Sequence, residues 1–144
     1  DEFGGVGLKK GESEQHGSNP SKSNVGSVPY LTAMADCLFC KIVEKKNPST
    51  VVRETDSWIA FRDIHPQAPT HVLVIPRRHV ATVNDLDAAT AGMLIEAAKS
   101  IAKAEGLSER GYRLVLNCNA DGGQTVFHVH VHVLGGRGMH WPPG

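Results

Sequence analysis

The sequence predicts an α+β protein, built from a five-stranded antiparallel sheet with one long helix and one short helix. Three observations lead to this fold class. Five short segments combine β-branched or aromatic residues with flanking turn residues, as strands do. The segments at 51–54 and 58–62 are only three residues apart, which indicates a hairpin. One stretch, residues 88–105, repeats apolar side chains at helical spacing.

Most of these elements have a recognisable start or stop signal. Asp36 is a candidate N-cap for the short helix and Asp87 for the long helix, while Gly106 is a candidate stop. The continuous apolar run at 71–75 indicates a central strand. The apolar stripe of the long helix comprises Leu94, Ala97, Ala98, Ile101 and Ala104. In chain order the predicted elements are helix 37–43, strands 51–54, 58–62 and 71–75, helix 88–105, and strands 112–117 and 127–134.

Length, charge and cysteine content narrow the class of protein. The 144 residues suit one domain, and a formal net charge of zero offers no bulk attraction to nucleic acid or to a membrane surface. No apolar run approaches the roughly 18 residues of a spanning helix. Three cysteines without a secretion signal indicate a reducing compartment. We therefore expect a cytoplasmic protein with no membrane or nucleic-acid partner, and the nucleus stays open as a second location.

Residues 1–35 form a separate region, which we predict to be a disordered leader or extension before a domain at 36–144. The region is rich in Gly, Ser and Asn and has almost no apolar periodicity. Its acids and its lack of arginine make it a poor transit peptide, although its serines leave import into an organelle open. Met34 is a candidate natural start.

The row His128, His130 and His132 is the feature around which the rest is organised. In an extended strand, alternate residues share a face, so the three imidazoles line one face and the intervening valines the other. A polar strand face with chance alternation is the simplest alternative. Otherwise two chemistries compete: metal ligation, and nucleophilic or acid–base work near neutral pH.

The loop before the three histidines is suited to bind a phosphate. Asp121 to Thr125 contains two glycines, an amide and a hydroxyl, which together offer unobstructed N–H groups and side-chain donors to phosphate oxygens. A Gly-Gly turn alone is weak evidence, because most such turns only connect strands. Placed directly before the histidines, it indicates a phosphate beside an imidazole.

At this point the chain resembles the histidine triad (HIT) superfamily, and its ending is similar to that of the Hint branch. The resemblance covers about residues 36–144 and rests on five segments: 61–71, 73–76, 121–126, the triad 128–133, and the ending 134–144 with its Trp-Pro-Pro-Gly. It implies the HIT fold, and a homodimer in which two subunits form one continuous ten-stranded sheet.

The resemblance also implies an activity. Such a protein would be a purine nucleoside phosphoramidase, which hydrolyses the P–N bond of adenosine or guanosine 5′-monophosphoramidates through a nucleotidyl-histidine and releases AMP or GMP. No cofactor would be required for catalysis. Two alternatives stay open: a hydrolase of adenylyl sulfate or dinucleoside polyphosphates, and a nucleotide- or zinc-binding interaction module with vestigial catalysis.

Carried over residue by residue, the resemblance makes His130 the nucleophile, His132 and His71 a proton relay, and His128 a support on the phosphate side. Gln124 and Thr125 would contact phosphate or leaving-group oxygens, with the Gly123 and Thr125 backbone as donors. Asp63 would bind the ribose, Asn117 the ribose or phosphate, and Trp141 would shape leaving-group specificity across the dimer. The apolar slot for the purine would be formed by Phe39, Ile42, Phe61, Ile64 and Leu73, which are equally plausible as plain core.

A second constellation is the pair Cys37 and Cys40 in a Cys-x-x-Cys. In some members of the family such a pair binds a structural zinc together with a histidine matching His79 and the first triad histidine, here His128. Four such ligands would make a closed, structural site. The alternative is a pair of core thiols without metal.

Overall fold

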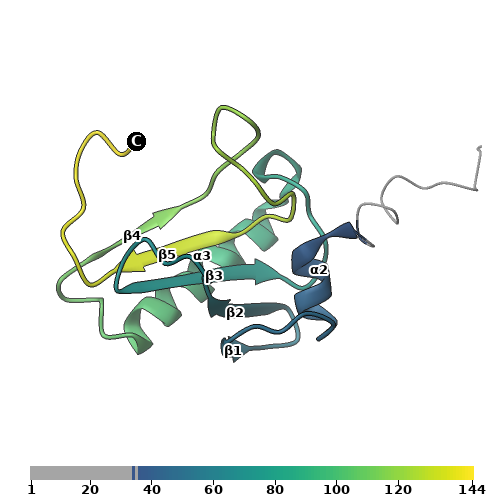
Figure 1. Ribbon diagram of the computed structural model, residues 1–144, viewed down its shortest axis with the longest axis horizontal. Coiled ribbons are helices and arrows are strands. Elements are labelled where there is room, and N and C mark those ends of the chain that lie inside the picture. The colour runs from purple at the N-terminus through teal and green to yellow at the C-terminus, as the bar shows by residue number, and fades with distance from the viewer. Residues whose placement is uncertain (1–33, 35) are drawn as a thin grey trace, which may run out of the picture.

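A computed structural model describes residues 34 and 36–144, so the predicted leader at 1–35 lies outside the described residues except for Met34. The described chain forms a five-stranded antiparallel sheet with one long and one short helix, as predicted (Figure 1). Its elements are α2 (Leu38–Val43), β1 (Val51–Glu54), β2 (Trp58–Arg62), β3 (Thr70–Pro76), the 3₁₀ helix η1 (Val83–Asp85), α3 (Ala88–Ala104), β4 (Tyr112–Val115) and β5 (Val131–Gly135).

The strand order is β1-β2-β3-β5-β4, and each neighbouring pair is antiparallel. The predicted central position of β3 is therefore confirmed, and every residue of this strand after Thr70 is buried. The register places Leu73 opposite His132 on β5 and opposite Phe61 on β2. This register brings one histidine of the triad to the middle of the sheet.

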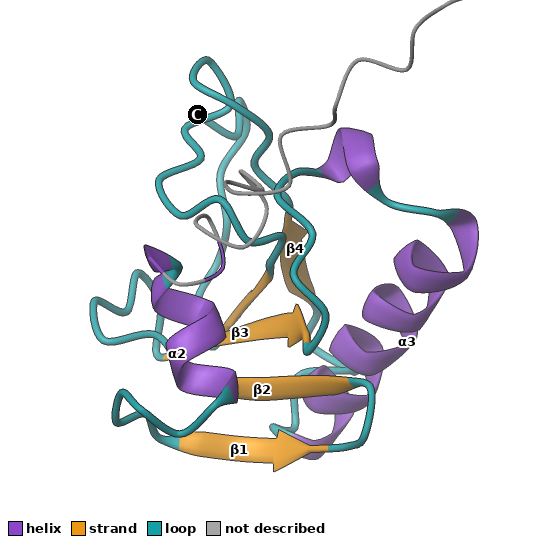
Figure 2. Ribbon diagram, turned by 90° about the vertical axis from the view of Figure 1, so that its right-hand side faces the viewer, coloured by secondary structure: helices purple, strands orange, loops and turns teal. Residues whose placement is uncertain are grey.

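The two helices cover opposite faces of the sheet (Figure 2). The α3 face holds the larger core, which includes Val72, Val74, Val129, Val131 and Val133. The α2 face holds a smaller core that contains Cys37, Phe39, Cys40, Ile42, Ile59, Phe61, Leu73 and Ile75. Alternation along the strands therefore sends valines towards α3 and leaves the other face for the histidines.

The caps of the helices agree with the sequence in one case and differ in the other. The Asp87 side chain accepts the Thr90 N–H at 2.7 Å at the start of α3. The N-cap of α2 is Cys37 and not Asp36, because the Cys37 Sγ accepts the Cys40 N–H. The buried stripe of α3 was predicted correctly except at its end, where Ala102 is buried and Ala104 is exposed, since position 102 lies four residues after Ala98.

The last predicted strand is shorter than expected, because β5 begins at Val131 and not at 127. The register pairs Val131 with Val74. The next positions back along β5 would face Ile75 and Pro76, and a proline has no N–H for the ladder. Val129 instead donates its N–H to the Val80 carbonyl at 2.7 Å. Strand β4 likewise ends at Val115, two residues before the predicted end.

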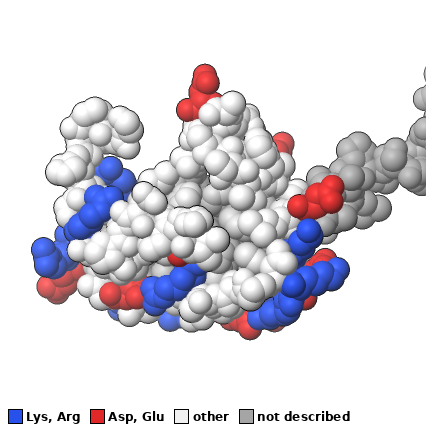
Figure 3. Space-filling model, in the orientation of Figure 1, with Lys and Arg blue, Asp and Glu red and all other residues white. Residues whose placement is uncertain are grey.

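The face of the sheet turned away from α3 carries few charged side chains over its middle, and Lys, Arg, Asp and Glu gather along its rim (Figure 3). None of the helices in the described part of the chain is long and apolar enough to cross a membrane.

Candidate active site and candidate metal centre

A cavity of about 280 Å³ opens between α2, the end of β2, the middle of β3, and the start of β5 with the segment before it. All five residues predicted for the purine slot line it: Phe39, Ile42, Phe61, Ile64 and Leu73. Asp63, Thr125, His130 and His132 line it as well. The cavity is also lined by residues that the sequence did not predict: Leu38, Asn47, Pro48, Ser49, Arg62, His65 and Val126. Of these, Leu38, Arg62, His65 and Val126 are chain neighbours of predicted residues, whereas the Asn47–Ser49 loop carried no signal.

His130 is held so that one ring nitrogen keeps its lone pair. Its Nδ1 lies 2.8 Å from the carbonyl oxygen of His128. A carbonyl can only accept, so Nδ1 carries the proton and Nε2 carries the lone pair. The ring is 7% exposed and lines the cavity. This geometry leaves His130 with a free ring nitrogen lone pair, which a nucleophile requires.

His71 and His132 form a directed pair beside it. The Gln67 N–H donates to Nδ1 of His71 at 3.0 Å, so the proton of the neutral His71 ring is on Nε2. That Nε2–H points to Nδ1 of His132 at 2.8 Å. The proton of His132 therefore sits on its Nε2, which is buried and makes no hydrogen bond within the described residues. His132 lines the cavity and keeps one buried N–H unused within the described residues.

Burial keeps these imidazoles neutral. It lowers the pKa of His132 to about 4, helped by the neighbouring His130 and His71. It also lowers the pKa of His71 and of His130, although the Asp63 carboxylate acts in the opposite direction on both. Neutral imidazole is the form that can act as a nucleophile or pass a proton along a chain.

Asp63 has two roles in this geometry. One carboxylate oxygen accepts the His65 N–H at 2.8 Å, and the other lies 3.4 Å from Nε2 of His71. The carboxyl group therefore caps its loop and also lines the cavity.

The Gln124 side chain and the Gly123 N–H, which the sequence predicts to contact the phosphate or leaving group, both make hydrogen bonds within the protein. The Gln124 amide is turned away from the cavity. It donates to the Val126 carbonyl and to the Ala81 carbonyl of a distant segment, and it accepts the Asn119 N–H. The Gly123 N–H donates to the Ala120 carbonyl at 3.0 Å. The hydrogen-bonding groups of Gln124 and Gly123 are thus occupied by partners that stabilise the loop. Thr125 is the residue of the 121–125 loop that lines the cavity.

Two other predicted residues lie away from the cavity of their own chain. Asn117 follows β4 and is not among the described residues that line it. Trp141 is 83% exposed, in the tail at the opposite end of the sheet from α2 (Figure 1).

His128 belongs to a different cluster from His130 and His132, and its predicted support of the phosphate stays a prediction. Its side chain is fully buried and does not line the cavity. Its Nε2 lies 2.8 Å from the Pro76 carbonyl, and its Nδ1 lies 3.5 Å from Sγ of both Cys37 and Cys40. The Nδ1 of His79 lies 3.2 Å from the Cys40 Sγ. The Cys and His ligand atoms of this Cys₂His₂ cluster all lie within 4.8 Å of one another.

The Cys₂His₂ cluster fits a tetrahedral metal ion such as zinc. Because the Pro76 carbonyl can only accept, the His128 proton is on Nε2, and the lone pair of Nδ1 faces the two sulfurs. Burial and the neighbouring His79 lower the pKa of His128 to about 4, so it stays neutral as a ligand must. Two sulfurs and two imidazole nitrogens are a common ligand set of structural zinc.

The group formed by Asp63, His71 and His132 also gathers possible ligand atoms within 4.8 Å, but it does not fit a metal. A ligating histidine normally donates its second N–H to an acceptor. Nδ1 of His71 instead receives the Gln67 N–H, so a metal on Nε2 would force two protons together at Nδ1. The hydrogen bonds of this group therefore suit the binding of a proton and not of a metal ion.

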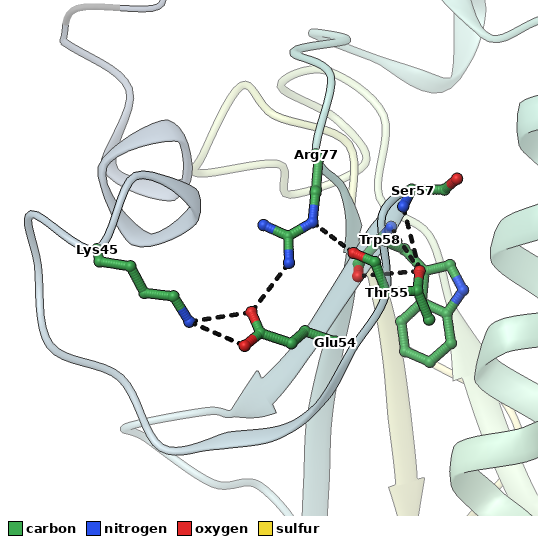
Figure 4. A network of polar contacts seen from close by, with 6 residues as sticks. All are labelled: Lys45, Glu54, Thr55, Ser57, Trp58 and Arg77. Atoms are coloured by element: carbon green, nitrogen blue, oxygen red, sulfur yellow. Dashed lines mark hydrogen bonds and ion pairs between the residues drawn. The ribbon is translucent and has the colours of Figure 1, made fainter.

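An ionic network ties both halves of the Cys₂His₂ cluster to the sheet (Figure 4). Glu54 on β1 accepts from Lys45, just after α2, and from Arg77, just after Pro76. Arg77 also donates to the Thr55 carbonyl. The helix with the two cysteines and the corner before His79 are thereby fastened to the same strand end.

Comparison with known proteins identifies the class. The model of the HIT domain family matches residues 44–139, and the described fold is that of solved HIT proteins. The chain therefore belongs to the HIT domain family and is a hydrolase of that family.

Three relatives show which members of the family this chain is similar to. A purine nucleoside phosphoramidase of Escherichia coli (strain K12) is 49% identical over 105 residues, which cover 71% of this chain and 88% of the relative. A 14 kDa zinc-binding protein of Zea mays is 50% identical over 112 residues, 74% of this chain and 87% of the relative. The crystal structure of a HIT family hydrolase from Legionella pneumophila Philadelphia 1 matches with a TM-score of 0.72 and 56% identity, covering 76% of this chain and 100% of that chain.

Proposed function

We propose that the protein is a purine nucleoside phosphoramidase, which hydrolyses the P–N bond of adenosine or guanosine 5′-monophosphoramidates. The observation that carries this proposal is the fixed tautomer of His130, whose Nδ1–H is held by the His128 carbonyl at 2.8 Å. The similarity to the Escherichia coli phosphoramidase supports the same substrate class.

The reaction proceeds in two displacements. Nε2 of His130 attacks the α-phosphorus, the P–N bond breaks, and a nucleotidyl-histidine forms. Nε2–H of His132 gives its proton to the leaving amine, and solvent replaces that proton on the His132–His71 pair, whose rings are joined over 2.8 Å, so neither ring is left as an anion. In the second step water attacks the phosphorus, the bond to His130 breaks, and AMP or GMP leaves. The proton from water passes through the His132–His71 pair to solvent, which restores the starting state.

The cavity supplies the rest of the recognition. Its apolar wall of Phe39, Ile42 and Leu73 takes the purine, and the Asp63 carboxylate accepts from the ribose hydroxyls. The Thr125 hydroxyl stands on the phosphate side, where it donates to an oxygen on which charge develops.

We also propose a structural zinc held by Cys37, Cys40, His79 and His128. Support comes from the buried cluster and from the zinc-binding relative of Zea mays. Bound zinc supplies cross-linking of α2 to the corner after β3 and takes no part in the displacement.

A homodimer is part of the proposal. Strand β4 lies at one edge of the sheet, and an edge strand pairs readily with a second copy. Pairing there gives a continuous ten-stranded sheet. Trp141 is 83% exposed in the single chain, so it is available to the active site of a partner subunit.

Turnover of adenosine 5′-phosphoramidate by the wild type and by His130→Ala tests the activity. We expect AMP release by the wild type and a loss of about 10³-fold or more in the variant. Added imidazole should restore part of the rate, because it replaces the missing nucleophile in the cavity. Equal rates for the two proteins would remove the nucleophile assignment, and faster turnover of adenylyl sulfate than of the phosphoramidate by the wild type would change the substrate class.

A further inference from the structure

One residue connects the Cys₂His₂ cluster to the nucleophile. The His128 side chain lies in the cluster, with Nδ1 3.5 Å from each of the two sulfurs. Its main-chain carbonyl accepts Nδ1–H of His130 at 2.8 Å. The peptide that orients the nucleophile therefore belongs to a residue whose side chain is anchored among the cysteines.

The sheet does little to hold this peptide. His128 and His130 precede β5, which begins at Val131. The Val129 N–H bonds to the Val80 carbonyl, outside the strand ladder. The side-chain contacts of His128 are therefore a principal restraint on its carbonyl, and three of them are to the Pro76 carbonyl and the two cysteines.

A second contact runs in parallel through α2. Phe39 stands between the two cysteines in the chain, and its ring lies 5.0 Å from the His130 ring in an edge-on arrangement. The same ring lies 5.4 Å from Phe61 and lines the cavity. Movement of either cysteine would carry Phe39 with it, because all three belong to the first turn of one short helix.

We propose that Cys37, Cys40 and His79 are positioning residues for the nucleophile. By holding the His128 side chain, they fix the carbonyl that sets the orientation and tautomer of His130. The cluster touches no substrate and acts only through His128 and Phe39. This inference rests on the proposed function, because it assigns the cluster to the step in which His130 attacks phosphorus.

The test compares a double variant, Cys37→Ser with Cys40→Ser, and a single variant, His79→Gln, with the wild type. Cys118→Ser is the matched control, because Cys118 is a free cysteine outside the cluster. We expect kcat for adenosine 5′-phosphoramidate to fall about 10- to 100-fold in the cluster variants, with a smaller change in KM. The control should keep the wild-type kcat.

Nitrogen NMR of the histidine rings provides a readout that does not depend on turnover. In the wild type His130 should show a single Nδ1–H tautomer, and in both cluster variants a mixture of tautomers. Removal of metal from the wild type with a chelator should give the same mixture, and added zinc should reverse it.

Two results would overturn the proposal. One is a folded cluster variant that keeps both the wild-type kcat and the single Nδ1–H tautomer of His130. The other is complete unfolding of every cluster variant and of the chelator-treated wild type, which would assign the cluster to global stability and not to positioning. If the wild type does not turn over the phosphoramidate, the proposed function fails, but the tautomer measurement still decides whether the cluster positions His130.

Discussion

The molecule contains two clusters of histidines a few residues apart in sequence. Their ring nitrogens have opposite kinds of hydrogen-bond partner. In the Cys₂His₂ cluster, His128 donates its Nε2–H to the Pro76 carbonyl, and its Nδ1 lone pair faces two sulfurs. Beside the cavity, His71 accepts the Gln67 backbone N–H and donates its own Nε2–H to His132. The residue type is the same, and the partner of the second ring nitrogen decides whether it suits a metal or a proton.

The largest expected effect is a loss of activity in a variant of the cavity histidines that leaves the Cys₂His₂ cluster intact. His132→Asn removes the buried Nε2–H that protonates the leaving amine, so kcat for the phosphoramidate should fall about 10²- to 10⁴-fold. Zinc content and the unfolding midpoint should stay near those of the wild type. Loss of zinc in this variant, measured by elemental analysis, would show that the clusters are not separate.

The second prediction concerns stability. Zinc should raise the free energy of unfolding of the wild type by about 4 kcal/mol at a thousandfold excess over its Kd, because only the folded chain gathers the four ligands. Thermal unfolding with zinc and with chelator measures this difference. His71→Asn should respond to zinc like the wild type, and a Cys40→Ser variant that responded equally would contradict the ligand set.

A matched pair of variants in the glycine-rich loop tests which loop residue faces the cavity. Gln124→Ala leaves two carbonyls and one N–H without their partner, so unfolding should become easier by about 1–3 kcal/mol, with little change in KM. Thr125→Val should do the reverse and lower kcat without a comparable loss of stability. A large rise in KM for Gln124→Ala would return its side chain to the phosphate.

The smallest effect is on the pH dependence of stability in metal-free protein. Burial lowers the pKa of His128 to about 4 in the folded chain, against 6.5 as the ordinary value. The unfolded chain therefore binds its proton first as the pH falls, so this stabilisation is full above pH 6.5 and is lost towards pH 4. The slope for one such histidine is about 1.4 kcal/mol per pH unit. His128→Asn, unfolded by urea across this range in chelator, should show a flatter profile.

The sequence predicted the elements that follow from local pattern. The hairpin of β1 and β2, the central β3 and the Asp87 cap of α3 are where periodicity and turn residues place them. The five residues of the apolar slot were named because they matched the family's motifs, and the cavity shows that they lie together.

Partners across the chain could not be predicted in the same way. Period two correctly placed His128, His130 and His132 on one side, but it could not show that Pro76 ends the ladder and draws His128 away from the cavity. The Gln124 amide likewise depends on the Ala81 carbonyl, 43 residues away. Hydrogen-bond partners set by long-range packing decide the role of each polar group.

The most direct test of the division between the clusters is the zinc content of three proteins purified in parallel: the wild type, His128→Asn and His71→Asn. Circular dichroism confirms that each is folded before elemental analysis. The account predicts one zinc per chain in the wild type and in His71→Asn, and close to none in His128→Asn. Two zinc ions per chain in the wild type, or loss of zinc from His71→Asn, would contradict it.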